Sequence, residues 1–301
     1  MNEKIYQNLI FQLDRLAAHN RQGSFQTRRR YYEAMKRFCK FLTNEYHVER
    51  LANIAPKHIF AYTKSMQAQG KSAATIKTDL AAIRFFHDQM PNPRYRLPEN
   101  NALILECRSF GKVDRTWSDA EFSRMQAKAL AVNRYDYILA LHLARYAGLR
   151  IHECFRIDTA TAKKALRDNA ITVKGKGGKI RTVPINESIS LALRMQLERT
   201  KLGHKLLVPD GVPTDQAIHQ LQEFLIRYRD EVKDTESCCP LTFHGLRHSF
   251  AAERYRELVA RGISELEAHY TVSQLLGHNR ADVTNVYLAS LKKQSPTSPS
   301  T

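Results

Sequence analysis

Three prolines, Pro91, Pro93 and Pro98, separate two parts of the chain that both carry helical patterns. Proline lacks a backbone N–H and clashes with the preceding turn, so no continuous helix can run through this segment. A length of 301 residues is enough for about two domains of ordinary size. We therefore expect one domain over residues 1–105 and a second over residues 106–301.

The first part is predicted to be a small domain of four helices. One set of apolar residues recurs at spacings of four, three and four: Tyr31, Met35, Phe38 and Leu42. This spacing places all of them on one face of a helix. Another set shares a face in the same way: Ile76, Leu80, Ile83 and Phe86. Ser72 is suited to cap that helix, and further helices are expected over about residues 3–19 and from Pro56 to Gly70.

Helix signals continue in the second part. Ser118 and Glu121 form a capping box, a pair that satisfies the first backbone N–H groups of a helix. A mostly apolar helix over residues 135–146 is expected to be buried and to end at Gly148.

Two β-prone runs, residues 170–173 and 180–183, flank a glycine-rich turn and predict a β-hairpin. Helical patterns resume from about residue 187. The expected fold class is therefore mainly α with one small β-hairpin, and the hairpin belongs to the second domain.

The charge of the chain indicates a polyanionic partner. The net charge is +17 and the pI is about 9.8, and the positive excess is spread over both halves. No apolar run approaches the ~20 residues of a membrane span. The polar start of the chain is not typical of a signal peptide. We expect a cytoplasmic protein with no membrane partner.

Five basic residues of the first domain lie near two predicted helix N-termini, where phosphates are favoured: Arg28, Arg29, Arg30, Lys71 and Lys77. They are candidates for contacts with DNA phosphates. The alternative interpretation is a helical bundle whose arginines are simply solvated.

The cysteines do not indicate a metal site or a disulfide. Five are present, and none forms a CxxC pair. An odd number of cysteines in a reducing compartment favours thiols over disulfides. We expect no metal and no other cofactor.

Two arginines, two histidines and a tyrosine could together break a phosphodiester: Arg150, Arg247, His244, His278 and Tyr287. Attack on phosphorus builds negative charge on two nonbridging oxygens, and a guanidinium can meet it with two parallel hydrogen bonds. A phenol with a pKa near ~10 is a reasonable nucleophile, because the bond that it forms keeps enough energy for the strand to be resealed. Each residue alone would be weak support, since Tyr287 is one of 13 tyrosines.

The order and spacing of these residues resemble the tyrosine recombinase (phage integrase) family. Similar proteins carry Gly-Leu-Arg, a lysine in a β-hairpin, His-x-x-Arg, Leu-Gly-His and a tyrosine nine residues later, and all five elements occur here. The resemblance makes Glu153 an acid that orients the site. It also makes Lys176 the general acid for the departing 5′ oxygen, with Lys174 and Lys179 as nearby rivals.

For the remaining residues, the resemblance implies that Arg150 and Arg247 bind the scissile phosphate. His278 would add a hydrogen bond to the phosphate, and His244 would assist removal of the proton from Tyr287. No metal or nucleotide is implied.

The resemblance also implies an activity and an assembly. Two domains would close as a C-shaped clamp on double-stranded DNA at a recombination site. Strand exchange would pass through a 3′-phosphotyrosyl intermediate and a Holliday junction, with four protomers on DNA. An accessory DNA-bending or directionality factor is a further possible partner.

Two other functions use the same fold. A type IB topoisomerase has the same catalytic groups but nicks and reseals a single duplex as a monomer. A DNA-binding regulator would keep the fold without the chemistry, but no catalytic group is missing here.

Overall fold

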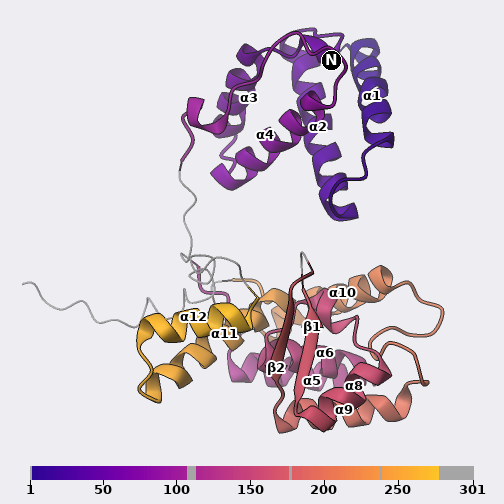
Figure 1. Ribbon diagram of the computed structural model, residues 1–301, viewed down its shortest axis with the longest axis vertical. Helices are drawn as coiled ribbons and strands as arrows, with labels where there is room; N and C mark the ends of the chain where they lie inside the picture. Colours follow the sequence, from indigo (N-terminus) through magenta and orange to yellow (C-terminus); the bar gives the residue numbers. More distant parts are fainter. Residues whose placement is uncertain (1, 107–112, 176–177, 238, 278–301) are drawn as a thin grey trace, which may run out of the picture. The chain divides into compact units, whose positions relative to one another are not determined.

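The chain forms two compact units, Met1–Arg108 and Ser109–Thr301, each with a hydrophobic core of its own (Figure 1). The computed structural model describes residues 2–106, 113–175, 178–237 and 239–277. None of the helices in these ranges is long and apolar enough to cross a membrane.

The first unit contains the four expected helices: α1 (Glu3–Ala18), α2 (Phe25–Glu45), α3 (Pro56–Ala68) and α4 (Ala73–Asp88). One short 3-10 turn, Leu51–Asn53, lies between α2 and α3, and another, Asn100–Ala102, follows α4. The side chain of Ser72 accepts a hydrogen bond from the backbone N–H of Thr75 and so caps α4, as predicted. Helix α2 packs against the other three helices. The two predicted apolar faces of α2 and α4 lie in the core, where only Tyr31 stays partly exposed.

The second unit has eight helices in its described residues: α5 (Asp119–Ala131), α6 (Tyr135–Ala147), α7 (Ile151–Cys154), α8 (Thr159–Asp168), α9 (Glu187–Arg199), α10 (Thr214–Val232), α11 (Phe243–Ala260) and α12 (Glu265–Leu275). Strands β1 (Ala170–Lys174) and β2 (Ile180–Pro184) pair antiparallel, with Thr172 opposite Thr182. The predicted fold class, mainly α with one small hairpin, is confirmed.

Helix α6 lies at the centre of this unit and contacts α5, α7, α9 and α11. Most of its apolar residues are buried, as the sequence predicted. Helix α12 contacts both α11 and β2, so the hairpin and the end of the described chain meet (Figure 1).

The segment that leads into α5 is fixed against the start of α11. The backbone N–H of Trp117 donates to Ser249 Oγ at 2.8 Å, and Trp117 Nε1 donates to the carbonyl oxygen of Thr242 at 3.0 Å. A Cβ on Gly245 would lie 2.6 Å from the carbonyl oxygen of Arg115 and from Trp117 Nε1, so this close approach needs glycine.

The predicted capping box also reaches beyond its own helix. Glu121 accepts from the backbone N–H of Ser118, as expected for the box. Its other carboxylate oxygen accepts from the backbone N–H of Asp234 and from the Ser237 hydroxyl. This buried side chain therefore ties the start of α5 to the loop before α11.

Candidate active site

Three of the predicted catalytic residues, Arg150, His244 and Arg247, line one pocket of about 570 Å³. Helix α10 also lines the pocket, through residues such as Leu225 and Ile226. The pocket brings together residues that are almost one hundred positions apart in the sequence.

A glycine turn places Arg150 in this pocket. Helix α6 ends at Gly148, which has a φ of +60°. A Cβ at this position would lie 2.4 Å from Phe250 Cδ1, so both the backbone conformation and the packing require glycine. Arg150 follows in an extended conformation as the residue before α7, with 29% of its side chain exposed.

Glu153 holds the Arg150 side chain. Its Oε1 accepts from Arg150 Nη1 at 3.0 Å, and its Oε2 accepts from the backbone N–H of Arg150 at 2.8 Å. One of the five N–H groups of the Arg150 guanidinium is used in this way, which leaves donors for an anionic ligand. The structure thus brings Glu153 to Arg150, and the orienting role of Glu153 in the site stays a prediction.

The second partner of Glu153 is Arg181 of β2, a residue that the sequence analysis did not single out. Arg181 Nη1 and Nη2 donate to the two carboxylate oxygens of Glu153 at 2.8 and 2.6 Å. Burial alone would raise the pKa of Glu153, but the hydrogen bonds from Arg181 and Arg150 and their positive charges lower it to about 2. Glu153 is therefore ionised at neutral pH.

Arg247 lies in α11 and is almost completely buried, with 1% of its surface exposed. Its Nη1 donates to the carbonyl oxygen of Gly148 and its Nη2 to the carbonyl oxygen of Leu276. The first of these joins Arg247 to the turn that carries Arg150. The second joins it to the end of α12, two residues before His278.

His244 lies in the first turn of α11, and its ring packs edge-on against that of His248, with centroids 5.2 Å apart. Desolvation and the positive charges of Arg247, Arg115 and Arg150 lower the pKa of His244 to about 4, although part of the side chain is exposed. His244 is therefore neutral at pH 7 and can accept a proton. His248 is buried, and desolvation, His244 and Arg115 lower its pKa to about 3.

Three predicted catalytic residues, Lys176, His278 and Tyr287, lie outside the described residues. The residues that precede two of them, Gly175 before Lys176 and Gly277 before His278, are described. The backbone N–H of Gly175 donates to the carbonyl oxygen of Lys179 at 2.7 Å, which closes the hairpin on both sides of Lys176. Gly277, with a φ of +65°, follows the end of α12 and precedes His278.

The five predicted phosphate contacts of the first unit have different environments. Arg30 and Lys71 line a pocket of about 780 Å³, together with Arg37 and Lys40, which the sequence analysis did not single out. Arg29 is exposed. Arg28 donates to the carbonyl oxygen of Asn20 and Lys77 to that of Glu106, so these two side chains have partners within the unit.

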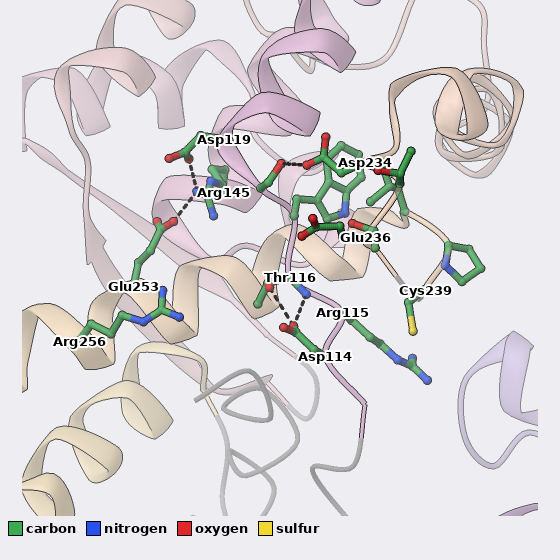
Figure 2. A pocket seen from close by; sticks show the side chains of 16 residues that line it. Asp114, Arg115, Thr116, Asp119, Arg145, Asp234, Glu236, Cys239, Glu253 and Arg256 are labelled. Carbon is green, nitrogen blue, oxygen red and sulfur yellow. Dashed lines mark hydrogen bonds and ion pairs between the residues drawn. The ribbon is translucent and has the colours of Figure 1, made fainter. Parts of the chain in front are cut away.

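Another pocket, of about 720 Å³, lies where the segment leading into α5 meets the loop before α11 (Figure 2). Figure 2 shows Arg145 between Asp119 and Glu253, and both carboxylates accept hydrogen bonds from it. The pocket has more acidic than basic residues and contains none of the predicted catalytic ones. It is less suitable for a phosphodiester than the pocket that is lined by Arg150, His244 and Arg247. Among the described residues, no group of three or more His, Cys, Asp or Glu could hold a metal ion.

Comparison with known proteins identifies the family. Residues 121–294 match the phage integrase family, and residues 13–90 match its N-terminal SAM-like domain. Tyrosine recombinase XerC of Mesorhizobium japonicum is 26% identical over 290 residues, which cover 91% of this chain and 88% of the relative. Tyrosine recombinase XerD of Staphylococcus aureus is 25% identical over 275 residues, or 88% of each chain.

Solved structures agree on the fold. XerH recombinase bound to a palindromic difH substrate has a TM-score of 0.62 and 19% identity, covering 92% of this chain and 80% of its own. Lambda integrase bound to DNA also has a TM-score of 0.62, with 16% identity and coverage of 92% and 95%. Since the family match alone spans more than half of the sequence, the chain belongs to the phage integrase family and is a tyrosine recombinase.

Proposed function

We propose that this protein is a site-specific DNA recombinase that cuts and rejoins duplex DNA through a 3′-phosphotyrosyl bond to Tyr287. The observation that carries the proposal is the shared pocket of Arg150, His244 and Arg247. Arg247 also holds Leu276, so the chain that continues to His278 and Tyr287 leaves from beside this pocket.

The two arginines supply the electrostatic part of the mechanism. When the phenol oxygen of Tyr287 attacks phosphorus, negative charge grows on the nonbridging oxygens. Arg150 is half-buried but reaches the pocket, and within the described part of the chain Glu153 takes one of its five side-chain N–H groups. Donors that are already oriented toward developing charge stabilise the transition state without reorganisation.

Protons move at two positions. His244 is neutral at pH 7, since its pKa is lowered to about 4, so it is not already protonated. We assign it the proton of Tyr287 as the new P–O bond forms, with the phosphate anion beside it favouring the protonated ring. The P–O5′ bond breaks, and Lys176 gives a proton to the departing 5′ oxygen. Resealing runs the same steps backwards: the 5′ hydroxyl attacks phosphorus and the tyrosine leaves.

The two units take different parts in this function. We assign DNA binding to residues 1–105 and catalysis to residues 106–301, and we place this activity in the cytoplasm. A lambda integrase tetramer bound to a Holliday junction is among the similar structures, with a TM-score of 0.60. Four protomers on DNA are therefore the expected assembly, with an accessory DNA-bending factor as a further partner.

Within the first unit, the basic pocket is the best candidate for contact with the DNA backbone. Changing Arg30, Lys40 and Lys71 together to Ala should weaken binding on every sequence, and should lower the slope of log K against log salt by about 2 to 3. An unchanged slope would assign DNA binding to another face.

The nucleophile is tested with nicked suicide substrates tiled across the DNA that flanks the gene. Loss of a short fragment traps the protein on the 3′ end. The wild-type protein should give a denaturant-resistant adduct in EDTA, with the label on the Tyr287 peptide, and Tyr287→Phe should give none. An adduct that persists in Tyr287→Phe would overturn the assignment. Joining of two separate sites distinguishes a recombinase from a type IB topoisomerase, which relaxes one duplex.

Arg150→Ala tests the phosphate site more cleanly than a change at Arg247, because Arg247 also joins two helix ends. Loss of a preorganised donor should slow adduct formation by about 10² to 10³ while DNA binding changes little. A rate within a few-fold of wild type would show that Arg150 does not contact the phosphate.

A further inference from the structure

Arg181 occupies an unusual place for a charged residue. Residues of β2 alternate between exposed and buried, and Arg181 takes an inward position next to the buried Val183. Only 6% of its side chain is exposed. A buried guanidinium is costly unless it is paired and hydrogen-bonded, so its partners show what it is there to hold.

Those partners lie on two other elements. Nη1 and Nη2 bind both oxygens of Glu153, which in turn binds the side chain and backbone of Arg150. Nε donates to the carbonyl oxygen of Leu275 at 2.8 Å, at the end of α12. One planar side chain therefore connects the hairpin, the Arg150 turn and the end of α12.

The contact with α12 is close. A Cβ on Gly277 would lie 3.3 Å from Arg181 Cδ and 3.4 Å from Nη1. The next carbonyl along, that of Leu276, is held by Arg247. Two arginines from two different elements thus fix consecutive carbonyls just before His278.

We propose that Arg181 is a positioning residue for strand cleavage: it aligns Arg150 through Glu153 and fixes the chain that leads to His278. This inference rests on the proposed function. Arg181 is too buried to reach DNA itself, so its loss should affect the rate of chemistry and leave DNA affinity nearly intact.

The test compares Arg181→Met and Arg181→Lys with wild type in the suicide-substrate assay. Misplacement of a catalytic group by about 1 Å can cost about 10² in rate, so Arg181→Met should slow adduct formation by about that factor. Lysine keeps the charge but is a point donor that cannot bridge a carboxylate and a carbonyl, so Arg181→Lys should recover only part of the rate. DNA affinity should stay within about threefold in both.

A pH profile separates positioning from mere stability. Among the described residues, two charged groups hydrogen-bond to Glu153: Arg150 on its own turn and Arg181 on β2. The neighbouring Cys154 thiol has a pKa raised well above its usual value, chiefly by burial. Without Arg181, Glu153 should take up a proton more readily, so cleavage by Arg181→Met should fall between pH 7 and 5. Wild type should not show this fall, and Arg181→Met combined with Glu153→Gln should lose it.

Arg167→Met is the matched control, because this arginine is 73% exposed and pairs only with its neighbour Asp168 in the described residues. Fluorescence of Trp117, the one tryptophan of the chain, checks that each variant is folded in the assay. If Arg181→Met does not fold, Arg181→Lys and its pH profile carry the test. Wild-type rates and a wild-type pH profile in the folded variants would overturn the inference alone, whereas absence of an adduct with wild type would overturn the proposed function.

Discussion

In both units an arginine holds a buried carboxylate through both of its oxygens, but the two arginines differ in how far water can reach them. In the first unit, Arg37 Nη2 binds both oxygens of Asp79, at 3.0 and 2.9 Å; the carboxylate is fully buried while 54% of the arginine side chain is exposed. In the second unit, Arg181 and Glu153 are 6% and 3% exposed.

The difference in exposure indicates different roles. The exposed guanidinium of Arg37 joins α2 to α4 and still lines the basic pocket, where a phosphate could reach it. The buried guanidinium of Arg181 contacts only protein in the described residues, and it sets the positions of groups that act on the substrate. Arg37 can therefore hold Asp79 and still meet a ligand in the basic pocket, whereas Arg181 holds its protein partners only.

The largest effect is expected from breaking the buried pair. Glu153→Gln leaves Arg181 and Arg150 without their anion, and removal of one member of a buried pair typically costs about 3–5 kcal/mol. Arg181→Met should cost somewhat less, because Arg150 still faces Glu153. The loss of unfolding free energy is measured by urea unfolding and followed through the fluorescence of Trp117, which is buried in the same unit.

The double variant is the control for this prediction. The double variant, Arg181→Met combined with Glu153→Gln, should lose less stability than the two single variants lose in sum. In the double variant neither member of the pair is left buried without the other. Strictly additive losses would mean that the two side chains do not stabilise the unit as a pair.

Much of the framework around these pairs could be predicted because its signals are local. The capping box at Ser118, the turn at Gly148 and the glycine-centred hairpin each depend on residues a few positions apart, and the structure confirms all three. Arg181 could not be predicted, because its partners lie 28 and 94 residues away. In the sequence it is an ordinary polar residue of a strand.

The predicted DNA contacts also show that local sequence does not reveal which residues meet in the folded unit. Charge and position near a helix N-terminus singled out Arg28 and Lys77, yet both donate to backbone carbonyls of their own unit. Arg37 and Lys40 were not singled out because they lie within a helix, and only the packing of α2 against α3 and α4 brings them to the basic pocket. Which basic residues face a common pocket is therefore a property of tertiary structure.

A smaller loss is expected from Arg37→Met in the first unit. Asp79 would remain fully buried, with the Tyr62 hydroxyl at 3.4 Å as its remaining side-chain partner in the described residues. We expect a loss of about 2 kcal/mol, below that of the fully buried pair because Arg37 is half exposed and partly screened. The loss should appear in far-UV circular dichroism, while the Trp117 transition stays in place. Movement of both transitions would show that the two units unfold as one.

Acid should weaken the buried pair in a defined pH window. The pKa of Glu153 is lowered from 4.5 to about 2, so its contribution is complete above about pH 4.5 and is lost as the pH falls toward 2. Between pH 7 and pH 3 the loss should be about 2 kcal/mol. The quantity to measure is the stability of wild type minus that of Glu153→Gln at each pH. A difference that does not change over this range would show that Glu153 is not held by its arginines.

The smallest effect is expected from Asp79→Asn, and this variant decides whether exposure is the property that separates the two pairs. The amide keeps the size of the carboxylate and can still accept a hydrogen bond from Tyr62 or Arg37. Arg37, released from its anion, can turn into water, so we expect a cost of about 1 kcal/mol or less.

Removing the acid is therefore milder than removing the arginine in the first unit. In the second unit, loss of Glu153 should cost more stability than loss of Arg181, because both arginines around Glu153 would stay partly or fully buried. Equal losses for Asp79→Asn and Glu153→Gln, measured by circular dichroism and by Trp117 fluorescence respectively, would show that solvent access to the arginine does not govern the strength of these pairs.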